Sequence, residues 1–277
     1  MLLALQGLLA AAEVAELRQI AAEGEFVDGG VSSPGLAAAG IKRNEQLSLA
    51  SAHQRRVEQL VLSALDRNET FRIAAEGEFV DGGVSSPGLA AAGIKRNEQL
   101  SLASAQQRRV EELVLGALDR NETFRTAAIP KLIRPPILSR YRPGMAYGVH
   151  IDNPIMRRPV PMRLDLSITA FLSDPDHYTG GELCIDTPYG EKRIKLPAGD
   201  AVLYPTTMLH RVGEITSGER LAAVTWIQSM VHEQAKRSML YDLAVVTQWL
   251  HSIAPQSPNY HRLSNTRANL VRMWAVD

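Results

Sequence analysis

Two histidines and one aspartate, His150, Asp152 and His210, are the residues whose types and spacing best suit metal chemistry. Two imidazoles and one carboxylate can hold three positions around Fe(II) and leave the others open for an oxidant. Arg220, ten residues after His210, adds a planar cationic fork that suits a carboxylate-bearing co-substrate. Together the four residues favour an oxidation that uses iron and 2-oxoglutarate.

Strand geometry is what must position these residues. Residues i and i+2 of a strand point to the same face, so His150 and Asp152, on a strand predicted over 149–152, are expected to converge on one ion. His210 is expected to begin a second strand placed opposite the first. A hairpin with Thr-Ser-Gly-Glu at its tip is expected to bring Arg220 onto the strand next to that of His210. The alternatives are structural histidines and a solvated arginine beside a turn.

The core of the chain has a β-rich texture. From 127 to 228, short β-rich runs are separated by turn signals rich in Pro and Gly, which is typical of a sandwich or a double-sheet jelly roll. Helical spacing predicts one helix over 11–22 and another after 229, and the tail over 255–277 is expected to be a polar loop with one short helix or turn. We therefore predict an α+β chain with an N-terminal region (1–126), a jelly-roll core (127–228) and a C-terminal helical extension (229–277).

A near-perfect tandem duplication fills most of the N-terminal region. Residues 20–72 recur as residues 73–125, and the 53-residue copies differ only at His53/Gln106, Gln59/Glu112 and Ser63/Gly116. Solenoids are built from several diverged repeats, so this pattern indicates a duplication inside an ordinary domain rather than a repeat fold. We expect one copy to pack natively on the core and the other to form an appendage that limited proteolysis attacks first.

Composition excludes several classes of function. Thirty basic and thirty acidic side chains cancel, so nothing points to a nucleic-acid or membrane partner. No apolar run approaches the roughly 20 residues that cross a bilayer, and the apolar N-terminus is expected to form an amphipathic helix rather than a signal peptide. The single cysteine, Cys184, is expected to be a buried thiol in a reducing cytoplasm.

The sequence also resembles a known family. The runs YRPGMAYGVHIDNP, RLDLSITAFLSDPDHYTGGEL and AVLYPTTMLHRVGEITSGERLAAVTWIQSMV are similar to those of the bacterial PKHD-type hydroxylases, which are relatives of prolyl hydroxylases among the Fe(II)/2-oxoglutarate dioxygenases. The resemblance extends from about Lys131 to the C-terminus, and the N-terminal helix with one copy of the repeat is also similar. It implies a double-stranded β-helix, Fe(2+), 2-oxoglutarate and L-ascorbate as reductant.

The resemblance assigns roles to particular residues. His150, Asp152 and His210 become the iron ligands, and Arg220 becomes the 2-oxoglutarate-binding residue. Tyr141 is expected to donate to the co-substrate or to be a packed aromatic, and Tyr147 is a candidate for the substrate pocket. Some relatives have a tyrosine where this chain has Phe171, so any such hydrogen bond must come from elsewhere, with Thr169 and Tyr204 as candidates. Asn97 and Gln99, or Asn44 and Gln46 in the first copy, either face the substrate or serve turns and caps.

Three functions therefore compete. The leading one is a dioxygenase that consumes 2-oxoglutarate and O2, hydroxylates a C–H bond and releases succinate and CO2. The others are a zinc-type hydrolase using the same triad and a non-enzymatic metal-binding jelly-roll module. The substrate, a small molecule or a peptide, is not disclosed. The apolar helical face of the extra repeat copy is a reason to expect self-association into a homo-oligomer.

Overall fold

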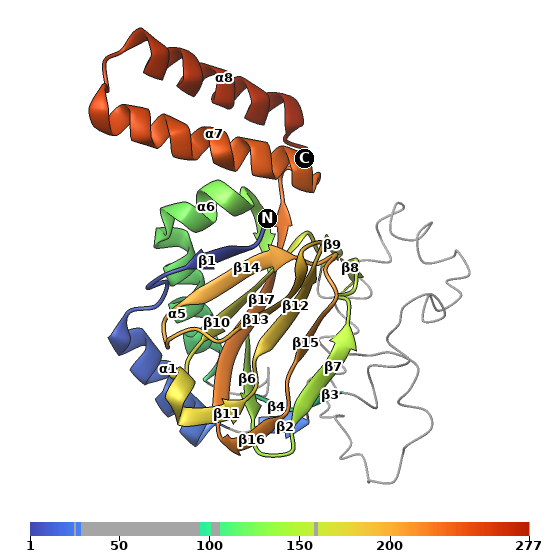
Figure 1. The fold of residues 1–277 in the computed structure, drawn as a ribbon. Helices are drawn as coiled ribbons and strands as arrows, with labels where there is room; N and C mark the ends of the chain where they lie inside the picture. The colour runs from blue at the N-terminus through green and yellow to red at the C-terminus, as the bar shows by residue number, and fades with distance from the viewer. Residues whose placement is uncertain (25, 29–94, 101–105, 158–159, 277) are drawn as a thin grey trace, which may run out of the picture.

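The computed structural model describes residues 1–24, 26–28, 95–100, 106–157 and 160–276, which form two antiparallel sheets with helices on the outer face of the larger one (Figure 1). Among these residues the larger sheet has eight strands, in the order β1-β14-β10-β17-β6-β4-β2 with β5 beside β17. They are β1 (Leu3–Leu5), β2 (Phe26–Asp28), β4 (Glu98–Leu100), β5 (Pro130–Ile133), β6 (Ile137–Tyr141), β10 (Leu166–Phe171), β14 (Ala201–Pro205) and β17 (Arg220–Ser229).

The smaller sheet has the strand order β13-β12-β15-β7-β3 within the described part of the chain. Its strands are β3 (Lys95–Arg96), β7 (Ala146–His150), β12 (Leu183–Thr187), β13 (Gly190–Ile194) and β15 (His210–Val212). The remaining strands form two short pairs: β11 (Tyr178–Gly180) with β16 (Ile215–Gly218), and β8 (Ile155–Met156) with β9 (Met162–Arg163). A 3-10 helix over Pro175–His177 lies directly before β11. The predicted mixture of helix and antiparallel sheet is thus confirmed.

The larger sheet has two buried faces, and β10 shows how the sequence separates them. Leu166 and Ile168 pack with the N-terminal helices, whereas Phe171 belongs to a second cluster between the two sheets. Side chains alternate along a strand, so Ser167 and Thr169 share the inner face with Phe171. The helices on the outer face are α1 (Ala11–Glu23), α5 (Gln107–Arg120) and α6 (Glu122–Ala128). The inner face is the one that can build a site.

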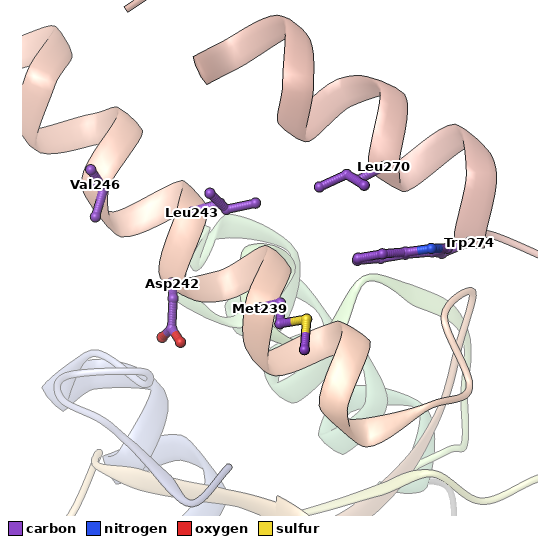
Figure 2. Close-up of a pocket in the computed structure, with 6 residues that line it drawn as sticks. All are labelled: Met239, Asp242, Leu243, Val246, Leu270 and Trp274. Carbon is purple, nitrogen blue, oxygen red and sulfur yellow. The ribbon is translucent and has the colours of Figure 1, made fainter. Parts of the chain in front are cut away.

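Two long helices form a C-terminal hairpin that projects beyond the sheets beside α6 (Figure 1). They are α7 (Gln234–Ile253) and α8 (Pro258–Trp274). A groove of about 420 Å³ lies along them, with Leu243 facing Leu270 and Trp274 (Figure 2). The sequence-based expectation of a polar loop with a short helix over 255–277 is wrong, because α8 spans 17 residues. Ser257 caps its first turn by accepting from the backbone N–H of Tyr260.

The two repeat copies divide the packing between them. The end of α1 and β2 come from the first copy, whereas β3, β4, α5 and the first four residues of α6 come from the second. β2 pairs with β4, so strands from different copies are neighbours in the larger sheet. The expectation that one whole copy packs natively is therefore not what the described residues show. Residues 29–94, which hold the rest of both copies up to β3, lie outside them.

Strand boundaries near the predicted site differ from expectation. β7 ends at His150, so Asp152 follows the strand rather than belonging to it. The strand of His210 was expected to face that of His150 from the other side of the site. Instead β15 is the hydrogen-bonded neighbour of β7 in the same sheet, where His210 pairs with His150. Arg220 is not on a strand next to that of His210, because β17 lies in the larger sheet. Between them, β16 pairs with β11 and ends at Gly218, whose φ of +76° favours glycine.

In the described ranges, no helix is both long and apolar enough to cross a membrane.

Candidate metal and co-substrate site

His150, Asp152 and His210 come together at the edge of the space between the sheets. One ligand atom from each lies within 4.8 Å of the others. The two imidazoles are cross-strand neighbours on β7 and β15, with ring centroids 4.1 Å apart, and Nε2 of His210 is 3.9 Å from Oδ2 of Asp152. Both histidines are buried and the aspartate is nearly so. The arrangement offers two nitrogen donors and one oxygen donor to a single ion.

Backbone carbonyls fix the orientation of both imidazoles. Nδ1 of His150 lies 2.8 Å from the carbonyl oxygen of Gly148, and Nδ1 of His210 lies 3.0 Å from that of Met208. A ring whose Nδ1–H donates to a carbonyl keeps the lone pair of Nε2 free for a metal. Burial, followed by the nearby charge of His210, lowers the pKa of His150 to about 3. Its imidazole is therefore neutral at physiological pH, as a metal ligand must be.

Ser167 holds the carboxylate of Asp152. Its hydroxyl donates to Oδ2 of Asp152, and Ser167 lies on the inner face of β10 with no exposed surface. This bond crosses from the larger sheet to the loop after β7. The sequence reasoning missed Ser167, although a small polar residue alternating with Leu166 and Ile168 is a signal for an inward-facing hydroxyl.

Arg220 lies on the larger sheet, facing the same inter-sheet space. It is only 1% exposed, and its Nε has no hydrogen-bond partner. No carboxylate of the described residues forms an ion pair with it. Its guanidinium instead lies between aromatic rings, 5.3 Å from the centroid of Tyr141 and 5.4 Å from that of Phe171. A buried cation without a counter-ion costs stability, and an anionic ligand beside it would offset that cost.

Tyr141, Tyr147 and Tyr204 lie near the triad, and Tyr141 and Tyr178 lie near the arginine. Tyr141 is directly across from Arg220 on β6, and burial raises its pKa to about 12, so its hydroxyl stays a donor. Burial also raises the pKa of Tyr204, whose hydrogen bond with Thr169 acts in the opposite direction. The ring of Tyr204 meets that of His210 edge-on at 5.2 Å. Tyr147 stacks on His150 with ring centroids 3.6 Å apart.

Comparison with known proteins identifies the family. The profile described as "2OG-Fe(II) oxygenase superfamily" matches residues 136–228, and that described as "PKHD-type hydroxylase C-terminal domain" matches residues 234–275. A PKHD-type hydroxylase of Synechococcus sp. (strain JA-2-3B'a(2-13)) is 43% identical over 216 residues, which cover 78% of this chain and 96% of the relative. The chain belongs to the PKHD-type hydroxylase family. A second relative, from Caulobacter sp. (strain K31), is 45% identical over 201 residues, covering 71% of this chain and 88% of its own length.

Among solved structures, a Pseudomonas putida prolyl-4-hydroxylase is 20% identical with a TM-score of 0.38, covering 82% of this chain and 92% of that one.

Membership of this family selects among the three interpretations of the sequence. The chain is an oxygenase enzyme rather than a hydrolase or a binding module, and its family implies Fe(2+) and 2-oxoglutarate. The residues present fit both groups. The two imidazole nitrogens and the carboxylate are a donor set that Fe(II) accepts, and the buried guanidinium of Arg220, whose Nε has no hydrogen-bond partner, is complementary to a carboxylate of the co-substrate.

Proposed function

We propose that this PKHD-type hydroxylase family member is a dioxygenase that hydroxylates a C–H bond of its substrate and releases succinate and CO2. The observation that carries the proposal is the convergence of His150, Asp152 and His210 at the edge of a space into which Arg220 also faces, buried and without an ion pair among the described residues. When bound, Fe(II) with 2-oxoglutarate supplies the activation of O2. The protein residues supply binding, orientation and shielding from water.

Each side chain has a distinct part in this proposal. Nε2 of His150, Nε2 of His210 and the carboxylate of Asp152 hold the iron. The guanidinium of Arg220 binds the distal carboxylate of 2-oxoglutarate. The hydroxyl of Tyr141, kept protonated by its high pKa, donates a hydrogen bond to the same co-substrate. Phe171 cannot supply this hydrogen bond, and its buried ring instead lies beside the guanidinium.

We also propose the fold type, the reductant, the compartment and the oligomeric state. We assign the two facing sheets to the double-stranded β-helix and L-ascorbate to the role of reductant, both because of the family resemblance. The buried, unpaired thiol of Cys184 suits the proposed reducing cytoplasm. Exposed apolar side chains on α7 and α8, including Trp249 and Ile253, support self-association into a homo-oligomer. Light scattering after size-exclusion chromatography tests the last point.

The Asp152→Ala substitution tests the function. It removes one of the three proposed ligand groups, so 2-oxoglutarate-dependent succinate formation is expected to fall to background in the iron-loaded protein. Asp176→Ala is the matched control, because the Asp176 side chain is 85% exposed in the 3-10 helix, and its succinate formation should match that of the unmodified protein. Undiminished turnover in Asp152→Ala contradicts the ligand assignment.

A further inference from the structure

Tyr178 is a buried phenol whose hydroxyl no hydrogen bond satisfies. It lies on β11, is only 3% exposed, and its Oη has no hydrogen-bond partner among the described residues. Burying a hydroxyl in this way costs stability, because the group gives up its bonds to water and gains none in return. The phenol is thus a donor that the folded chain leaves unused.

The unused hydroxyl lies close to the guanidinium of Arg220. Tyr178 pairs with Gly218 on β16, two residues before Arg220 begins β17. The two side chains flank Gly181, where an added β-carbon would lie 3.1 Å from Cε2 of Tyr178 and 3.1 Å from Cδ of Arg220. Burial raises the pKa of Tyr178, and the nearby charge of Arg220 acts in the opposite direction. The hydroxyl therefore keeps its proton at physiological pH, beside a cation.

Two neighbouring donors here lack an acceptor. Nε of Arg220 is buried without a hydrogen-bond partner among the described residues, as Oη of Tyr178 is. Neither residue can satisfy the other fully, because a guanidinium only donates and the phenol proton needs an acceptor of its own. A carboxylate has two acceptor oxygens and can take a hydrogen bond from each donor. The pair is therefore complementary to one carboxylate group.

Packing fixes the phenol in this position. Nζ of Lys195 donates to the backbone carbonyl of Tyr178 at 2.6 Å and lies 4.0 Å from the centroid of its ring. The ring also belongs to the cluster between the sheets that contains Tyr141 and Phe171. A side chain that is already ordered loses little entropy when it binds a ligand, so its hydrogen bond contributes more to affinity.

The proposed function brings a carboxylate of 2-oxoglutarate to Arg220, and Phe171, the other ring beside the guanidinium, has no hydroxyl to offer it. We propose that Tyr178 is a further co-substrate-binding residue, whose hydroxyl donates to the carboxylate that Arg220 binds. This inference rests on the proposed function, since that function is what places 2-oxoglutarate in the site.

Two matched substitutions test the inference. Tyr178→Phe removes the hydroxyl alone, and Tyr189→Phe makes the same change at a tyrosine that is 96% exposed in the turn between β12 and β13. Binding of 2-oxoglutarate and of oxalate to the iron-loaded full chain is measured by calorimetry without oxygen. Oxalate can chelate a metal but has no distal carboxylate, so its affinity reports on the metal site alone. Thermal unfolding is measured on the same proteins.

We expect Tyr178→Phe to bind 2-oxoglutarate about tenfold more weakly and to bind oxalate as the unmodified protein does. It should unfold at the same or a higher temperature, because an unsatisfied buried hydroxyl has been removed. Tyr189→Phe should leave all three quantities unchanged.

The inference is overturned if Tyr178→Phe binds 2-oxoglutarate normally, if it loses oxalate affinity equally, if it unfolds at a lower temperature, or if the unmodified protein binds no 2-oxoglutarate. Calorimetry without oxygen does not depend on turnover. A chain that binds 2-oxoglutarate through Tyr178 but forms no succinate when oxygen is supplied would therefore count against the proposed function alone.

Discussion

Ser167 shows how a residue outside the triad can control it. Its hydroxyl donates to Oδ2 of Asp152 from the opposite sheet and so fixes the direction in which the carboxylate points. Partners of this kind are typically worth about 10- to 100-fold in metal affinity. Ser167→Ala is therefore expected to weaken iron binding by about that factor, as measured by metal titration under anaerobic conditions. Unchanged affinity would mean that the loop after β7 holds Asp152 without help.

Substitutions of Arg220 test how the co-substrate binds. Hydrogen bonds to a charged group contribute about 1.5–3 kcal/mol, so Arg220→Ala should weaken 2-oxoglutarate binding by roughly 10- to 150-fold. Arg220→Lys should recover part of this loss, since an ammonium keeps the charge but not the planar fork. Calorimetry measures both. Arg193→Ala serves as the control because the Arg193 side chain is 69% exposed on β13, and it should bind the co-substrate normally.

At this scale the sequence predicted which residues meet, but partly for the wrong reason. His150, Asp152, His210 and Arg220 do gather around one space, as their types and spacing suggested. The supporting geometry was different, because Asp152 follows its strand and Arg220 lies on the other sheet from His210. Alternation along β10 could show that Ser167 faces inward, but it could not identify Asp152 as the partner of Ser167, since the packing of the two sheets brings these residues together.

The C-terminal hairpin depends on one buried arginine at its base. Arg237 is 3% exposed, and Nη1 donates to the carbonyl oxygens of Val231 at 2.7 Å and His232 at 2.6 Å. Arg237→Ala removes both bonds and leaves a buried carbonyl unpaired, which we expect to cost about 1–3 kcal/mol of unfolding free energy. Urea denaturation measures it.

Arg272→Ala is the control for this loss, since Arg272 is exposed on α8 and its hydrogen bond goes to Asn269 in the same helix. Its effect should stay within about 0.5 kcal/mol. Equal destabilisation by the two substitutions would contradict the role given to Arg237.

Long strands with alternating side chains were predicted well, whereas α8 was not. The strands over 166–172, 201–204 and 221–228 appear where the sequence placed them, because each has one face on the helices and one between the sheets. In α8 none of the side chains is fully buried. Few apolar residues of α8, such as Leu270 and Trp274, contact α7. Apolar residues at helical spacing were therefore too few for the sequence to predict this helix. The cap at Ser257 was the signal that remained.

For the whole molecule, the duplication makes a clean deletion experiment available. Removing residues 29–81 joins Asp28 to Gly82 and leaves one complete copy, with all described residues present. The connection between β2 and β3 would shrink from 66 residues to 13. A shorter connection loses less entropy when its ends are brought together, and this smaller entropic cost should add about 1.4 kcal/mol to the free energy of unfolding. Urea unfolding measures the gain.

The shortened chain should also keep its metal affinity and 2-oxoglutarate binding, because no residue of the proposed site is removed. A less stable protein, or one that no longer binds either, would show that part of 29–81 supports the core.

The packed segments begin in one copy and finish in the other, so recombination between the two copies in the gene can restore a single copy that keeps all of these segments. An unequal crossover anywhere within the matching stretch would excise a whole number of codons, keep the reading frame and rebuild a single intact copy. Shortened alleles that encode an active protein should therefore arise spontaneously during propagation of the gene.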